Sequence, residues 1–482
     1  MSDSTSKNQI NSINRDLWPL YVLNGVQSIA FGSFIVLVVP LSLLMWPGDD
    51  YHALEIGILI TILFWSGSFC GLLFGRLVDK FSRIKIIFFL SIFRGIPMIM
   101  LGFAIPGLGI QTWGYFIAWV FVFGCFSGGM YPSVVSLSND KVPREIRSRF
   151  FGYYEIVRNL STVFGFLIAS FLVQVGLWRQ LFWGIGILIL IFGIFTFIHV
   201  EEPKRGMMRE ELTLVLQDES IKYDFQIDKK MMKKTMLSNT NKVALIEGIS
   251  TMILMGSINI LILPYIQTEP HNIAPFTTAV FMVVFGLTGG LLGTLLLARL
   301  CDKIAKEHPV RRLPIIVFAI TGGLLTFALF FFLPWPRLTV EQGKDVAYLM
   351  TRPSIYIMGA MFFMSRAIFS LYMVNQVPVL QEINLPEAQG QIISWNQFLE
   401  SLGRGIGPLL TGILLFFTVN NYQLVALVLI LFILPGITLW LMALKWFPED
   451  RQNIKIILEE RAKILKDRQN STSTPTSRLL KP

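Results

Sequence analysis

At residues 75–85 the chain reads G-R-L-V-D-K-F-S-R-I-K, between two long apolar runs. A second stretch, residues 298–303, reads A-R-L-C-D-K and also lies between two apolar runs. The two copies are 302 − 79 = 223 residues apart and share four positions: Arg76, Leu77, Asp79 and Lys80 match Arg299, Leu300, Asp302 and Lys303. A repeat of this length in an apolar chain indicates two homologous membrane bundles joined head to tail.

The composition excludes an ordinary soluble domain. The 482 residues are 53% hydrophobic and only 15% charged, and the mean hydropathy is +0.60. A helix of about 20 apolar residues crosses the hydrocarbon core of a bilayer. The sequence predicts an all-α integral membrane protein of two six-helix bundles, with twelve transmembrane helices near 18–46, 54–77, 84–105, 113–137, 152–175, 180–200, 243–267, 275–298, 313–334, 354–378, 393–418 and 422–446.

The distribution of basic residues predicts the orientation in the membrane. Of the 41 Lys and Arg, 33 fall in the termini and in the loops that lie on the same side as the termini, whereas 4 fall in the loops on the other side. Because basic residues accumulate in cytoplasmic loops, we expect both termini in the cytoplasm of a multi-pass cell-membrane protein. The net charge of +10 then reflects topology and the bilayer as partner, so no nucleic-acid partner is expected. The first apolar run is too long for a cleavable signal.

Five segments are expected from these patterns. They are a cytoplasmic N-terminus (1–17), an N-terminal six-helix bundle (18–200), a charged cytoplasmic linker (201–242), a C-terminal six-helix bundle (243–446), and a cytoplasmic amphipathic helix with a disordered tail (447–482).

The quoted stretch resembles the loop motif of the major facilitator superfamily (MFS), G-x-L-a-D-r-x-G-r-k, through Gly75, Leu77, Asp79, Lys80 and Arg83. Further similarities are G-G-M-Y-P at 128–132, D-K-V-P-R-E-I-R-S-R at 140–149 and W-R-Q-L-F at 178–182. Residues 379–391 (V-L-Q-E-I-N-L-P-E-A-Q-G-Q) and 403–408 (G-R-G-I-G-P) look closest to the macrolide and siderophore efflux branch. Many members carry an arginine linked to proton coupling where this chain has Val120, so that role is not transferred.

The resemblance implies a gate on the cytoplasmic side. In the family, the aspartate at the position of Asp79 docks the second helix against the start of the eleventh, and the glycine at the position of Gly75 permits close packing. The predicted gating residues are Gly75, Asp79, Lys80, Arg83, Asp302 and Lys303.

Charged residues inside the spans are costly in lipid and therefore point to function. In this fold helices 1, 4, 7 and 10 line the central cavity, so Arg366 and Glu247 are the leading candidates for substrate binding or coupling. Glu155 with Arg158, and Glu400 with Arg404, have the spacing of ion pairs on one helix face. Arg94 is interpreted as a structural or snorkelling residue. Neutral polar candidates are Asn24, Gln27, Asn259, Asn375 and Gln376.

These features predict a secondary transporter that moves a small organic solute by alternating access, as an exporter driven by an ion or proton gradient. Two alternatives remain open: uptake of an anionic metabolite with a cation, and a non-transporting receptor, scaffold or lipid carrier on the same fold. The chain has no G-x-x-x-x-G-K-[ST] loop, metal-ligand cluster or catalytic triad. It is therefore not expected to be an enzyme or to use a cofactor or metal. A monomer is expected.

Overall fold

The computed structural model describes residues 3–142, 144–203, 229–306, 308–385 and 388–472. Every regular element in these ranges is helical. Twelve helical stretches are long and apolar enough to cross a membrane, from Ile13–Val36 to Tyr422–Arg461. The predicted all-helical fold with twelve spans is therefore confirmed.

The first six spans form the N-terminal half. Its helices are α1 (Asp3–Val36), α2 (Val38–Met45), α3 (Ala53–Lys80), α4 (Arg83–Leu101), α5 (Ile110–Ser127), α6 (Met130–Lys141), α7 (Arg144–Gln174) and α8 (Trp178–His199). The loop between α3 and α4 is two residues long. It ends where the Ser82 hydroxyl accepts a hydrogen bond from the Lys85 N–H and caps α4.

The last six spans form the C-terminal half. After the short α10 (Lys229–Lys234), its α-helices are α11 (Asn239–Gln267), α12 (Pro275–Phe281), α13 (Thr288–Leu291), α14 (Ala298–Ala305), α15 (Arg312–Phe332), α16 (Val340–Lys344), α17 (Val346–Met350), α18 (Pro353–Glu382), α19 (Gln389–Phe417) and α20 (Tyr422–Thr472). The eighth span is one continuous rod in which two π-helical turns, Met282–Leu287 and Leu292–Leu297, join α12, α13 and α14. A 3-10 turn, Pro309–Arg311, precedes α15.

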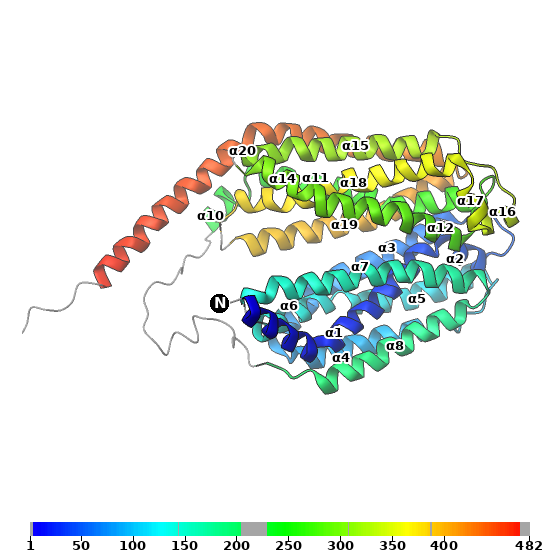
Figure 1. Cartoon of the computed structure of the whole chain (residues 1–482), viewed down its shortest axis with the longest axis horizontal. Helices are drawn as coiled ribbons and strands as arrows, with labels where there is room; N and C mark the ends of the chain where they lie inside the picture. Colours follow the sequence, from blue (N-terminus) through cyan, green and yellow to red (C-terminus); the bar gives the residue numbers. More distant parts are fainter. Residues whose placement is uncertain (1–2, 143, 204–228, 307, 386–387, 473–482) are drawn as a thin grey trace, which may run out of the picture.

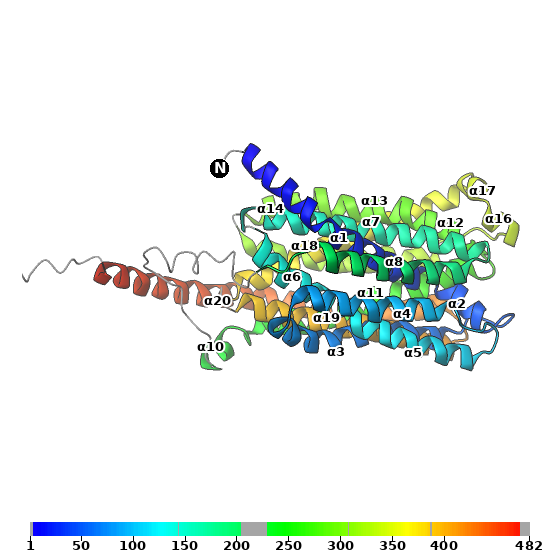
Figure 2. The same ribbon diagram turned by 90° about the horizontal axis from the view of Figure 1, so that it is seen from below.

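The two halves lie side by side with their long helices roughly parallel (Figures 1 and 2). The beginning of α1, the helix α10 and the end of α20 gather at one end of the molecule, which we call the linker end. The short helices α2, α16 and α17 lie at the opposite end.

Close packing at small residues shows that the sequence repeat is also a structural repeat. An added Cβ at Gly25 would meet Ser161, and the added Cβ of Gly403 would meet Ile249. In the repeat, Ile249 is equivalent to Gly25 (249 − 25 = 224), and Gly403 is equivalent to Ser161 (403 − 161 = 242). The contacts of Gly32 with Thr162 and of Gly256 with Arg404 follow the same two offsets. The first and fifth spans (α1 and α7) thus pack together in one half as the seventh and eleventh spans (α11 and α19) do in the other.

Contacts between the halves extend from the opposite end to just past the middle of α3, where Phe69 meets Phe398 of α19 with ring centroids 6.0 Å apart. The Thr61 hydroxyl donates to the Gly405 carbonyl at 2.8 Å, and the Trp65 indole donates to the Leu402 carbonyl at 3.1 Å. Phe171 of α7 meets Phe276 of α12 with ring centroids 5.8 Å apart. Further along α3 toward the linker end, Leu72 and Leu73 are exposed. The halves are therefore joined at the opposite end and separated at the linker end.

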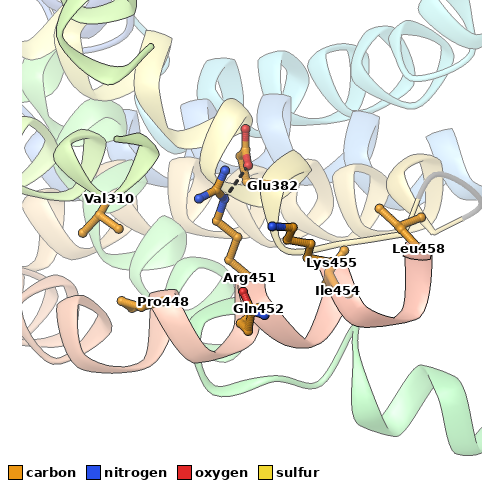
Figure 3. Close-up of a pocket in the computed structure, with 8 residues that line it drawn as sticks. All are labelled: Val310, Glu382, Pro448, Arg451, Gln452, Ile454, Lys455 and Leu458. Carbon is orange, nitrogen blue, oxygen red and sulfur yellow. Dashed lines mark hydrogen bonds and ion pairs between the residues drawn. The ribbon is translucent and has the colours of Figure 1, made fainter. Parts of the chain in front are cut away.

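Helix α20 continues past the membrane span without a break, whereas the sequence predicted a separate helix after residue 446. Its extension packs on the linker end of the C-terminal half. Asp450 accepts a hydrogen bond from the Thr240 N–H at 3.0 Å, and Arg451 donates to Glu382 at 3.0 Å. A surface cavity of about 300 Å³ lies beneath this extension (Figure 3), lined by Val310, Glu382, Pro448, Arg451, Gln452, Ile454, Lys455 and Leu458.

Candidate functional site

The loop motif is held by a hydrogen-bond network centred on Arg83, which is 1% exposed. The Glu202 carboxylate, which follows α8, accepts the Arg83 Nε–H at 2.7 Å. It also accepts the Ser82 hydroxyl at 2.8 Å and the backbone N–H groups of Arg83 and Ile84 at 3.2 and 2.9 Å. A carboxylate at the N-terminus of α4 also interacts favourably with the helix dipole.

The same arginine reaches two further elements. Its terminal nitrogens donate to the carbonyls of Ser136 in α6 and Pro203 after α8, at 3.3 and 2.7 Å. Partial burial alone would raise the pKa of Glu202, but its hydrogen bonds with Ile84, Arg83 and Ser82 hold it below its usual value. Sequence reasoning missed Glu202 by assigning it to a solvated linker. The available signal was its position directly after the sixth span, at the same end as Arg83.

The second motif copy makes a related contact. Arg312 at the start of α15 donates to Asp302 at 2.8 Å and to the Asn375 side-chain oxygen at 2.9 Å. Asn375 is fully buried and also donates to the Leu371 carbonyl. The structure thus ties Asn375 to the motif at the linker end, although the sequence predicted it as a substrate or coupling candidate.

Three of the remaining gating residues, Gly75, Lys80 and Lys303, lie at open positions. An added Cβ at Gly75 would meet no atom within 4 Å, and Lys80 and Lys303 are exposed. The side chain of Asp79 lies outside the part of the chain that the structure describes. The space beside Gly75 fits the separation of the halves at the linker end.

Glu247 lies about 12 Å along α11 from its start and is completely buried. Tyr372 of α18 donates to one carboxylate oxygen at 2.9 Å, and the Thr251 hydroxyl, one turn along α11, donates to the other. The indole of Trp440 lies beside the carboxylate, although its Nε1 makes no hydrogen bond. Gly436 of α20 makes room for the group, since a Cβ there would lie 3.1 Å from the Glu247 Cγ.

Glu400 of α19 occupies a second buried polar cluster, next to Gly248 of α11. Asn396 donates to Glu400 at 2.6 Å, and Gln376 of α18 donates to Asn396 at 3.2 Å. Gly248 permits this approach, because its added Cβ would lie 3.4 Å from the Glu400 Cγ. Sequence reasoning did not identify Asn396.

The predicted ion pair between Glu400 and Arg404 does not form. Asn396, one turn before Glu400, holds the carboxylate instead, while Arg404 donates to the Met252 sulfur at 3.5 Å. By contrast, Glu155 and Arg158 do form an ion pair on α7, and both side chains are exposed. Within the described residues, no basic side chain lies within ion-pair distance of Glu247 or Glu400.

Arg366 lies in the middle of α18, about 20 Å from its start at Pro353. Its side chain is exposed, and helical spacing places it on one face with Met373 and Val377, which are also exposed. No hydrogen bond or ion pair to Arg366 occurs among the described residues. It is therefore a guanidinium at mid-helix with room for a ligand.

Polar candidates of the N-terminal half are more enclosed than expected. Asn24 is 7% exposed and donates to the Tyr154 carbonyl at 3.0 Å, and Gln27 is 5% exposed. Arg94, also 5% exposed, does not snorkel, because its side chain lies 4.7 Å from the ring centre of Phe123. In the other half, Asn259 is partly buried, with no side-chain hydrogen bond among the described residues.

The arrangement supplies binding groups and acids. Two carboxylates are buried among neutral hydrogen-bond donors in the C-terminal half, and Arg366 is exposed on α18. No group of three or more metal-ligating residues occurs in the described part of the chain. Burying an isolated carboxylate in its charged form is costly, so these sites favour the neutral acid and are suited to taking up and releasing protons.

Comparisons with known proteins agree with this architecture. The structure is similar to a bacterial homologue of the human lysosomal transporter Spinster in an inward-facing, unoccupied conformation. That match has a TM-score of 0.68 and 15% identity, and it covers 91% of this chain and 98% of the other. The D-xylose-proton symporter gives a TM-score of 0.61 at 15% identity, with 90% and 97% coverage. The nucleoside transporter NupG gives 0.60 at 13% identity, with 89% and 98% coverage.

A search of curated protein sequences finds no match. The family model described as Major Facilitator Superfamily matches residues 17–382, which is most of the chain. Together with the twelve spans, this match shows that the chain belongs to the Major Facilitator Superfamily.

Proposed function

We propose that this chain is a proton-coupled secondary transporter that exports a small organic solute across the cell membrane by alternating access. The linker end, rich in Lys and Arg, is the cytoplasmic end in this proposal. Separation of the halves at that end then corresponds to an inward-open state. The efflux direction rests on the similarity of residues 379–391 and 403–408 to macrolide and siderophore exporters.

The environment of Glu247 is the single observation that carries the coupling proposal. Its carboxyl group accepts hydrogen bonds from Thr251 and Tyr372 but has no basic partner in the described part of the chain. A neutral acid is stable in this setting, whereas a carboxylate requires water or a cation. Glu247 therefore releases its proton when α11, α18 and α20 move apart and water enters.

Arg366 is the proposed solute ligand. A guanidinium at the middle of a span persists because it binds a partner or lines a water-filled cavity. Its exposed position leaves its donors free for an anionic or zwitterionic solute. This preference also supports the second candidate, uptake of an anionic metabolite together with protons.

A panel of solutes tests the proposal and identifies the substrate in the same experiment. Purified protein is reconstituted into liposomes with an imposed pH gradient and a mixture of organic anions, zwitterions, nucleosides and sugars. Mass spectrometry of the lumen then reports which solutes cross. We expect at least one solute to accumulate only with protein and gradient present, in the direction opposite to proton flow. Accumulation with the proton flow indicates uptake instead.

Two other outcomes contradict the proposal. No flux of any solute, in protein that remains folded, points to a receptor or scaffold. Movement of fluorescent phospholipid between leaflets, without solute flux, points to a lipid carrier.

A further inference from the structure

Arg94 is a buried charge that the proposed transport cycle does not use. It lies on α4 about 16 Å from the linker end of that helix and about 10 Å from its other end. Leu90, Ser91 and Met98, one turn away on the same face, are completely buried. Arg94 therefore points into the core of the N-terminal half and cannot reach either membrane surface.

The two buried arginines of the N-terminal half differ sharply in their partners. Arg83 is bonded to a carboxylate and two carbonyls. Arg94 has no carboxylate or carbonyl partner among the described residues, and its Nε is buried without a hydrogen bond. Its guanidinium lies over the face of the Phe123 ring, which stabilises a cation but does not supply a negative charge. An arginine in this setting lacks a counter-charge.

A second unpaired donor belongs to the same region. The Gln27 Nε2 is buried without a hydrogen-bond partner, although the residue is only 5% exposed. Gln27 lies one turn after Asn24, which donates to the Tyr154 carbonyl, and the phenol of the same Tyr154 interacts electrostatically with Arg94. The carboxylate next to Tyr154, Glu155, is already bound to Arg158. Helices α1 and α4 thus each place a buried donor without an acceptor, among the described residues, in the core of the N-terminal half.

We propose that Arg94 and Gln27 form a binding site for a small monovalent anion in the core of the N-terminal half. An anion supplies the acceptor that both donors lack and neutralises the buried guanidinium. Arg94 is only 5% exposed, so the site has little room, which favours chloride or a carboxylate group over a bulky solute. This site is separate from Arg366 and Glu247, and it does not depend on the proposed transport activity.

Thermal unfolding of the purified protein tests the site directly. Sodium gluconate is replaced stepwise by sodium chloride, formate or acetate at constant ionic strength. Because a ligand that binds only the folded state stabilises it by mass action, we expect a saturating rise in Tm of about 1–2 °C at ten times Kd for a chain of 482 residues. A stronger effect of chloride assigns an inorganic anion, and a stronger effect of formate or acetate assigns the carboxylate group of a solute.

Three variants make the result specific. Arg94→Gln should abolish the anion-dependent rise, and Gln27→Leu should require higher anion concentrations for the same rise. The matched control Arg404→Gln, at an in-span arginine of the other half that has no assigned binding role, should respond as the unmodified protein does. No rise in the unmodified protein would overturn the proposal, and this test does not require any variant to fold. The same rise in Arg94→Gln or Gln27→Leu as in the unmodified protein would also overturn it.

Discussion

Replacing Glu202 by glutamine tests the network that organises the loop motif. The substitution keeps the shape of the side chain and removes its charge. Four donors converge on this carboxylate: the Ser82 hydroxyl, the Arg83 side chain, and the backbone N–H groups of Arg83 and Ile84. The Arg83 guanidinium would remain buried after the change, next to the carbonyls of Ser136 and Pro203 but without the charge of Glu202.

The expected cost follows from the burial of the two partners. Breaking a fully buried ion pair costs about 3–5 kcal/mol, and a hydrogen bond to a charged group contributes about 1.5–3 kcal/mol. Arg83 is 1% exposed, but Glu202 is 32% exposed, so water replaces part of the lost interaction. We therefore expect Glu202→Gln to lower the free energy of unfolding by about 2 kcal/mol, which corresponds to a Tm about 2 °C lower for a chain of 482 residues.

The effect should depend on pH with a defined sign. Because the pKa of Glu202 is lower in the folded protein, the folded state binds fewer protons at this site than the unfolded state. Its contribution to stability is complete above the unfolded pKa of about 4.3 and is lost as the pH falls through the folded value. The difference in Tm between the unmodified protein and Glu202→Gln should therefore be constant near pH 7 and shrink below about pH 4.

Thermal unfolding in detergent, followed by tryptophan fluorescence, is the assay. Glu201→Gln is the matched control, since Glu201 is exposed and has no hydrogen bond or ion pair in the described part of the chain. That variant should stay within about 0.5 kcal/mol of the unmodified protein. Equal Tm values for the two variants at pH 7 would show that the Glu202 carboxylate does not stabilise the loop motif.

Three further predictions concern the site and the gate. Arg366→Met should express and fold but reduce transport at least about tenfold, with Arg366→Lys less impaired, because only arginine offers a planar fork of donors; near-normal flux in liposomes through the methionine variant would contradict its role as solute ligand. Asp79→Asn should favour separation of the two halves at the linker end. A cysteine at Leu73 should therefore react faster with a maleimide in Asp79→Asn than in the protein that keeps Asp79, and an unchanged rate argues against a gate held by Asp79. In a background lacking the native cysteines, an impermeant reagent on intact cells should label a cysteine at Gln342 but not one at Glu201, and the reverse pattern would invert the proposed orientation.

The apolar runs were sufficient to predict the fold, because a bilayer imposes the length of each span. Helix ends were less predictable. Helix α11 starts at Asn239 rather than near residue 243, since Ser238 caps it by accepting the Asn241 N–H at 3.4 Å. The π-helical turns of the eighth span also left no sign in the apolar pattern.

The site was only partly predictable, because helical spacing indicates a face but does not decide among competing partners. Glu400 has Asn396 one turn before it and Arg404 one turn after it, and the structure pairs it with the asparagine. Tyr372 was not among the predicted polar candidates, although its hydroxyl donates to Glu247. The rotation of α18, which buries Tyr372 and exposes Arg366, is set by packing against α11, α15 and the eighth span.

In the proposed transport cycle the buried acid Glu247 carries the coupled proton. Comparing Glu247→Gln with the unmodified protein in the same liposomes, using a solute identified by the panel, tests this role. Glutamine keeps the acceptor oxygen for Tyr372 but cannot release a proton. We expect Glu247→Gln to exchange labelled for unlabelled solute at a normal rate yet to fail to accumulate solute when a pH gradient is imposed. Gradient-driven accumulation by Glu247→Gln at the level of the unmodified protein would contradict it.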